Sequence, residues 1–223
     1  MNATPSNEAF WENHYARGTS SPASTPPRPN DALVHLLDTL DIRPGRALEL
    51  GAGSGGDAIW LAGQGWQVTA ADISATAVAR LSELANALGL SGNLHAVRHD
   101  LARSMPPAPF DLIYACYLHT PVDIGRPGIL RRAGGLMSLG GTLIVVDHAS
   151  TAPWSWAHPD TRYPAPEQTY ATFGLGDDWE PLLLTARERI ATGPDGETAR
   201  VTDNLIVARC IDDAHRGPSS TPL

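Results

Sequence analysis

Residues 46–57, with the sequence RALELGAGSGGD, begin as a short apolar strand and run into a cluster of glycines before a predicted helix. Glycines let the backbone turn tightly and approach a ligand, and the start of the following helix offers free N–H groups. The spacing of Gly51, Gly53 and Gly56 also fits G-x-G-x-x-G. This stretch therefore predicts a nucleotide-type ligand, without separating a dinucleotide from a nucleoside.

Strand-like and helix-like segments alternate on both sides of this stretch. The predicted strands are 46–50, 67–71, 95–98, 110–116 and 142–146, and the predicted helices are 31–40, 57–63, 75–88 and 127–139. This alternation predicts a parallel sheet with helices on both faces. Two strand-like runs, 182–190 and 200–210, flank a Pro-Asp-Gly turn and predict a closing antiparallel hairpin, which a plain dinucleotide-binding Rossmann domain lacks.

Three acidic residues occur at the ends of predicted strands. Glu49 lies two residues before the first glycine, Asp72 ends the second strand, and Asp100 follows the third. Because the carboxyl ends of parallel strands meet at one edge, the three side chains are expected to surround one crevice. A carboxylate at Glu49 suits a cationic amino group better than a pyrophosphate. Asp72 suits ribose hydroxyls, and Asp100 suits an adenine amino group.

Composition excludes several classes of function. The chain has 223 residues, a net charge of -8, and 16 basic residues of which every one is arginine. The missing lysine excludes a Walker A loop and a pyridoxal Schiff base. The acidic balance disfavours nucleic acid and anionic membranes as partners. Two cysteines are too few for a cysteine-built zinc site, so no metal is expected. With no signal peptide or membrane span apparent, we expect a cytoplasmic protein.

Three regions are predicted along the chain. Residues 1–30 hold a short aromatic helix and a Pro/Ser-rich linker, 31–212 form the main domain, and 213–223 form a flexible tail. In the first region, Trp11 and Tyr15 fall on one side of the helix. We expect this helix to act as a lid over the ligand. The linker 18–30 is expected to be mobile, because its composition gives it no means of packing.

The segments FWENHYARG and LELGAGSGGDAIWLAGQGWQVTAADIS resemble class I S-adenosylmethionine (SAM) methyltransferases, most closely the small bacterial enzymes of the tellurite-resistance and thiopurine type. Ala52 departs from the cysteine that many members carry. The resemblance implies a doubly wound seven-stranded sheet of order 3-2-1-4-5-7-6, mostly parallel, with an antiparallel C-terminal hairpin. It also implies SAM as cofactor and S-adenosylhomocysteine (SAH) as product. The implied cofactor residues are Glu49, Gly51, Ala52, Gly53, Gly55, Asp72, Ile73, Asp100, Leu101, Trp11 and Tyr15.

The acceptor is expected to bind where the fourth and fifth strands end. Tyr117, His119, Asp147 and His148 lie there, and His119 is the best candidate for a general base, because histidine ionises near neutral pH. The long segment 151–168 is predicted to be a substrate wall or lid. The expected substrate-binding residues are Tyr117, His119, His148, Trp154 and Trp156.

The leading hypothesis is therefore methyl transfer from SAM to a small molecule at O, N or S. Two alternatives remain open. One is an NAD-linked oxidoreductase that uses the same glycine loop, and the other is a SAM-binding sensor without catalysis.

Overall fold

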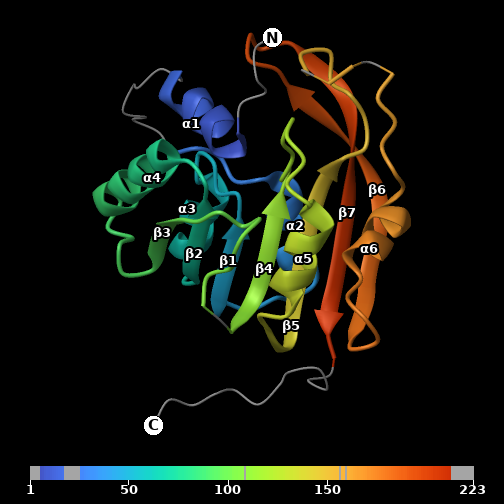
Figure 1. The fold of residues 1–223 in the computed structure, drawn as a ribbon, viewed down its shortest axis with the longest axis horizontal. Helices are drawn as coiled ribbons and strands as arrows, with labels where there is room; N and C mark the ends of the chain where they lie inside the picture. The colour runs from blue at the N-terminus through green and yellow to red at the C-terminus, as the bar shows by residue number, and fades with distance from the viewer. Residues whose placement is uncertain (1–5, 18–25, 108, 156, 159, 212–223) are drawn as a thin grey trace.

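The chain folds around one seven-stranded sheet in a computed structural model that describes residues 6–17, 26–107, 109–155, 157–158 and 160–211 (Figure 1). The strand order is β3-β2-β1-β4-β5-β7-β6. The first five in this order are parallel, whereas β7 is antiparallel to both β5 and β6. The predicted fold class is thus confirmed. The strands are β1 (Arg46–Leu50), β2 (Gln67–Asp72), β3 (Leu94–Arg98), β4 (Phe110–Cys116), β5 (Met137–His148), β6 (Trp179–Thr192) and β7 (Thr198–Cys210).

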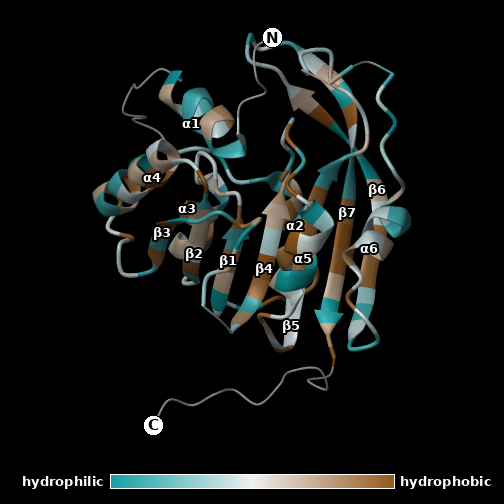
Figure 2. Cartoon of the chain, viewed as in Figure 1, coloured by the Kyte–Doolittle hydropathy of each residue, from teal (hydrophilic) through white to brown (hydrophobic). Residues whose placement is uncertain are grey.

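Six helices accompany the sheet in the described part of the chain: α1 (Asn7–Arg17), α2 (Asp31–Thr39), α3 (Gly56–Gly63), α4 (Ala75–Ala87), α5 (Arg126–Gly134) and α6 (Pro166–Phe173). Side chains on a strand alternate between its two faces. Ala47 and Leu112 accordingly join one buried core with α2, α3 and α4, while Leu48 and Ile113 join a second core with α5 and α6. Figure 2 shows the apolar colouring concentrated on the central strands, whose residues are buried on both faces.

Helix α1 lies against α4 at the edge of the molecule (Figure 1). No described residue of α1 is fully buried, so this helix contributes little to either core. It lies above the carboxyl ends of the parallel strands (Figure 1).

Three expectations about elements need correction. The predicted helix 127–139 ends at Gly134. Strand β5 begins at Met137, before the predicted strand 142–146, because Met137 pairs with Phe110 of β4. Segment 151–168 is not a loop throughout, since α6 begins at Pro166. Part of the linker is packed: Asn30 caps α2, and its backbone N–H donates to Asp57 at 2.5 Å.

The remaining residues of that linker, 18–25, and the predicted tail 213–223 lie outside the described residues. Within the described helices, none has the length and apolar character needed to cross a membrane.

Candidate functional site

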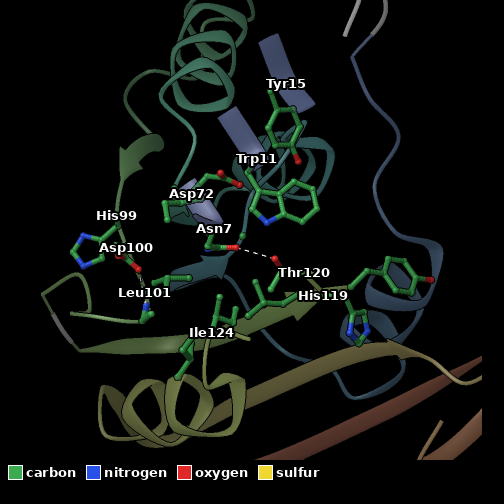
Figure 3. Close-up of a pocket in the computed structure, with 16 residues that line it drawn as sticks. Asn7, Trp11, Tyr15, Asp72, His99, Asp100, Leu101, His119, Thr120 and Ile124 are labelled. Carbon is green, nitrogen blue, oxygen red and sulfur yellow. Dashed lines mark hydrogen bonds between the residues drawn. The ribbon is translucent and has the colours of Figure 1, made fainter. Parts of the chain in front are cut away.

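A pocket lies at the carboxyl ends of the parallel strands, beneath α1 (Figure 3). The sheet order reverses between β1 and β4, and ligands of open α/β sheets bind at such a switch point. The pocket is lined by Asn7, Trp11 and Tyr15 from α1, by Gly51, Asp72, Ile73, His99, Asp100, Leu101 and Ala102 after β1 to β3, and by Tyr117, Leu118, His119, Thr120, Ile124 and Ile129 after β4.

The glycine loop after β1 has no space for side chains. Gly51 has φ 80°, and a Cβ atom there would lie 2.8 Å from the Cδ1 atom of Leu118. Gly53 has φ 53°, and its Cβ would lie 2.7 Å from the hydroxyl of Tyr15. Larger residues would therefore be strained and would also push the pocket walls apart. The loop presents backbone rather than side chains to a ligand.

Glu49 lies beneath this loop, almost fully buried. Its Oε2 atom has no hydrogen-bond partner among the described residues. Burial raises the pKa of Glu49 well above its usual range, and the nearby Asp57 and Asp72 raise it further, while the Tyr114 hydroxyl partly opposes them. A buried carboxylate without a cation is costly. Glu49 is therefore suited to a ligand that brings a positive charge.

Asp72 stands at the end of β2 and lines the pocket. Its two oxygens accept hydrogen bonds from the backbone N–H groups of Gly53 and Ser74, each at 2.8 Å. Burial raises the pKa of Asp72, and these two bonds partly offset that effect. Each carboxylate oxygen keeps a second lone pair, so Asp72 can still accept from the hydroxyls of a ligand.

Asp100 lies further along the same edge and also lines the pocket. It accepts from the backbone N–H of Ala102 at 3.0 Å and pairs with Arg103 at 3.2 Å. Ile73 and Leu101 flank it with apolar surface. This end of the pocket can therefore receive a flat ring that carries a hydrogen-bond donor.

Helix α1 is attached on both sides of the pocket. On one side, Glu12 accepts hydrogen bonds from the Ser74 hydroxyl at 2.8 Å and from the backbone N–H of Thr76 at 3.2 Å, at the start of α4. The hydroxyl of Thr76 also donates to Glu12 and has the largest effect on its pKa, which these hydrogen bonds together lower to about 2. On the other side, the Thr120 hydroxyl donates to Asn7 at 2.8 Å (Figure 3).

The rings of Trp11 and Tyr15 lie on the pocket side of this helix, with centroids 6.1 Å apart. The Arg80 guanidinium also donates to the Tyr15 carbonyl at 2.7 Å. The two aromatic rings thus form a wall that is held in place from the main domain.

His119 lines the opposite end of the pocket, after β4. Its Nε2 atom lies 3.4 Å from Oδ1 of Asp147, without the geometry of a hydrogen bond. Arg126 donates to both oxygens of Asp147, at 2.6 and 2.8 Å. Burial opposes ionisation of Asp147, but His119 and Arg126 outweigh it and hold its pKa below the usual range. A histidine beside a permanently ionised carboxylate suits proton acceptance.

The rings of Tyr117, His148 and His119 form a stack. The centroids of Tyr117 and His148 are 4.2 Å apart, and those of His119 and His148 are 5.6 Å apart. A second pocket lies beyond His148 and is lined by residues of β5 to β7 and the segment after β5: His148, Ser150, Ala152, Trp154, Ser155, Arg189, Ala191 and Val201.

The structure brings most of the predicted site residues to one place. Those that line the main pocket are Trp11, Tyr15, Gly51, Asp72, Ile73, Asp100, Leu101, Tyr117 and His119. Glu49, Ala52, Gly53 and Gly55 belong to β1 and its glycine loop but are not among the lining residues. His148 and Trp154 line the second pocket instead. Trp156 lies outside the described residues.

Sequence reasoning missed the residues that hold the site together. Asn7, Glu12 and Thr120 attach α1, and Arg126 neutralises Asp147. Only Glu12 belongs to a segment that the sequence analysis singled out, and each contact joins segments far apart in the chain. The nearest available signal was the position of Thr120 next to His119.

The residues present fit SAM as a ligand. The partnerless Oε2 of Glu49 matches an α-ammonium, and Gly51 and Gly53 leave backbone against which the amino-acid part can lie. No group of three or more metal-ligating side chains occurs among the described residues.

Residues 47–141 match the family described as "Methyltransferase domain". A probable thiol methyltransferase 2 from Arabidopsis thaliana is 30% identical over 131 residues, which are 56% of this chain and 58% of that protein. The chain thus spans less than two thirds of this curated relative.

Two solved structures share the fold. TehB from Haemophilus influenzae superposes with a TM-score of 0.63 at 19% identity, over 89% of this chain and 66% of TehB. A structure described as "Conversion of a Disulfide Bond into a Thioacetal Group during Echinomycin Biosynthesis" superposes with a TM-score of 0.68 at 22% identity, over 92% of this chain and 93% of the other. Residues 47–141 are therefore similar to a methyltransferase domain, and the chain shares the fold of TehB.

Proposed function

We propose that this protein transfers a methyl group from SAM to a small-molecule acceptor. The observation that carries the proposal is the placement of Glu49 and Asp72 around the glycine loop. One is a buried carboxylate that lacks a cation, and the other is a pocket carboxylate with lone pairs to spare. An ionised Glu49 would repel a pyrophosphate, so a nicotinamide dinucleotide fits this edge poorly.

The cofactor-binding roles follow from the position of each group. Glu49 holds the α-ammonium, Asp72 accepts from the ribose hydroxyls, and Asp100 accepts from the adenine amino group. Trp11 and Tyr15 cover the pocket from α1, and the contacts of Glu12 with α4 hold them there. When bound, SAM supplies a methyl group that its sulfonium has already activated.

The chain's contribution to the reaction is then alignment and exclusion of water. The wall formed by Trp11 and Tyr15 keeps solvent out, and its rings favour a nearby positive charge. Tyr117, His119 and Thr120 border the place where an acceptor atom must approach. Where the acceptor carries a proton, His119 accepts it beside the ion pair of Asp147 and Arg126.

A small molecule suits the acceptor side better than a nucleic acid. The second pocket offers the rings of His148 and Trp154 together with the hydroxyls of Ser150 and Ser155. The net charge of -8 disfavours a phosphate backbone. The name of the Arabidopsis relative, a probable thiol methyltransferase, adds support for a small nucleophile.

The direct test incubates the protein with methyl-labelled SAM and a panel of hydrosulfide, thiocyanate, a phenol and a heteroaromatic amine. We expect SAH formation that depends on one class of acceptor. In the same protein, Asp72→Ala should lose about 1.5 to 3 kcal/mol of SAH binding free energy, because a charged acceptor of two hydroxyls is removed.

The control for this loss is Glu83→Gln on the exposed face of α4, which should bind SAH as the wild type does. A second variant, Asp72→Asn, keeps one oxygen for the glycine loop. Wild-type affinity for SAH in both Asp72 variants would refute the role given to this carboxylate.

A pH effect on SAH binding follows from Glu49. In the free protein, burial, Asp57 and Asp72 raise the pKa of Glu49. Glu49 therefore stays protonated at pH values at which an ordinary carboxyl group has already ionised. An α-ammonium favours the ionised form. Binding therefore releases a proton, and the affinity for SAH rises with pH until free Glu49 ionises.

Calorimetry over a range of pH, with two buffers that differ in their heat of ionisation at each pH, measures this release. SAH should give different apparent enthalpies in the two buffers. Glu49→Gln should abolish the difference, and so should 5′-methylthioadenosine, which lacks the α-amino group. Equal enthalpies for wild-type protein with SAH would contradict this account of Glu49.

The role of His119 can be separated from cofactor binding. For an acceptor that must lose a proton, His119→Ala should lower kcat by about 10²- to 10⁴-fold and change SAH affinity little. The wild-type profile of kcat should show a limb in the range where histidine ionises, and the variant should lack it. His95→Ala, on the exposed side of β3, is the control. If His119→Asn keeps full kcat at every pH, His119 only positions the acceptor.

A further inference from the structure

The carboxylate of Asp203 lies behind the ring stack, in the middle of β7 and almost fully buried. The register of the sheet places it directly across from His148 on β5 and from Arg187 on β6. No motif in the sequence points to it. Its carboxylate nevertheless lies beside three side chains at the proposed acceptor site, those of Tyr117, Arg189 and His148.

Both oxygens of Asp203 face these side chains. Oδ2 accepts from the Tyr117 hydroxyl at 2.8 Å and from Nε of Arg189 at 2.5 Å. Arg189 also donates from Nη2 to the Tyr117 hydroxyl at 3.1 Å, which closes a triangle of three groups. Oδ1 accepts no hydrogen bond from the described residues, and Nδ1 of His148 lies 3.7 Å from it.

The backbone of Tyr117 is strained. Its φ of 56° lies in the left-handed region, which is unusual for an aromatic residue. Such strain persists where surrounding contacts enforce it, and it concentrates at functional sites. The turn at Tyr117 is held by hydrogen bonds from Tyr117 N to Val146 O and from His119 N to Tyr117 O, and it directs Leu118, His119 and Thr120 to the pocket.

Burial and the neighbouring charges keep Asp203 and Tyr117 each in one protonation state. Burial favours the neutral form of Asp203, but His148, Arg189 and Tyr117 outweigh it and lower its pKa. Burial and the charge of Asp203 together raise the pKa of Tyr117. Tyr117 therefore stays a hydroxyl donor, and Asp203 stays a carboxylate that neutralises Arg189.

We propose that Asp203 is a positioning residue of the acceptor site, which acts through Tyr117 and His148. It fixes the two rings between the main pocket and the second pocket, and so sets the turn that presents His119. It also neutralises Arg189 in the wall of the second pocket. This inference rests on the proposed methyl transfer, and it assigns Asp203 no contact with cofactor or acceptor.

A purely structural ion pair of the β6–β7 hairpin would give a different result. Its loss would lower the melting temperature and leave the properties of the folded protein intact. A positioning role instead predicts a folded variant with normal cofactor affinity and impaired turnover. The two readings are therefore separated by comparing kcat and KM with the SAH dissociation constant.

The experiment compares wild type, Asp203→Asn and Tyr117→Phe, and the double variant, with each acceptor of the panel. Asparagine keeps the shape and an oxygen for Tyr117 but removes the charge, so this variant should fold. We expect kcat to fall on the order of 10- to 100-fold. The SAH dissociation constant by calorimetry should stay within about twofold of wild type. Since both residues act in one unit, the double variant should be no worse than the poorer single variant.

The matched control is Glu188→Gln, which removes the exposed ion pair with Arg200 on the same hairpin. It should leave kcat and SAH binding unchanged. Wild-type kcat in Asp203→Asn, or losses that multiply in the double variant, would overturn the proposal. Absence of turnover by the wild type with every acceptor overturns the proposed function and this role together, and it is seen before any variant is compared.

Discussion

The unneutralised carboxylate of Glu49 is the feature on which the site depends. Glu49, Asp57 and Asp72 are all largely buried. The charges of Asp57 and Asp72 lie close enough to raise the pKa of Glu49. Such a group destabilises the free protein unless it binds a proton. A ligand that brings the missing cation would remove this cost. In the loop above it, Gly51 and Gly53 have positive φ angles and lack the side chains that would meet Leu118 and Tyr15.

The two halves of the site are joined by helix α1. Glu12 attaches this helix to the start of α4, where the helix dipole favours a negative charge, and Asn7 attaches it to Thr120 on the acceptor side. Under the proposed function, helix α1 thus connects the cover over the cofactor with the geometry at the acceptor. Two ion pairs support the acceptor side. Arg126 neutralises Asp147, and Arg189 neutralises Asp203.

Local patterns in the sequence were enough for most of the fold and for the cofactor side. Alternating strands and helices, the glycine loop and the Pro-Asp-Gly turn are all short-range signals. The seven strands overlap those that these signals predicted, whereas α6 was not predicted. The helix predicted for 127–139 was wrong at its end, because pairing of Met137 with Phe110 decides that boundary. The packing of Asn30 on Asp57 likewise depends on a residue 27 positions away.

The acceptor side was less predictable for the same reason. Tyr117 and His119 follow β4, His148 ends β5, and all three were predicted from position alone. Asp203 and Arg189 reach the same place only because β6 and β7 return antiparallel to β5, and neither belongs to a recognisable motif. Long-range pairing leaves no local signature, so these residues needed the three-dimensional structure.

The most direct test of the central claim is a calorimetric titration of the intact chain with SAH and, separately, with NAD. The account predicts a single SAH site of micromolar affinity and no heat with NAD, because Glu49 and Asp72 favour an ammonium and ribose hydroxyls over a pyrophosphate. Binding of NAD without binding of SAH would contradict it.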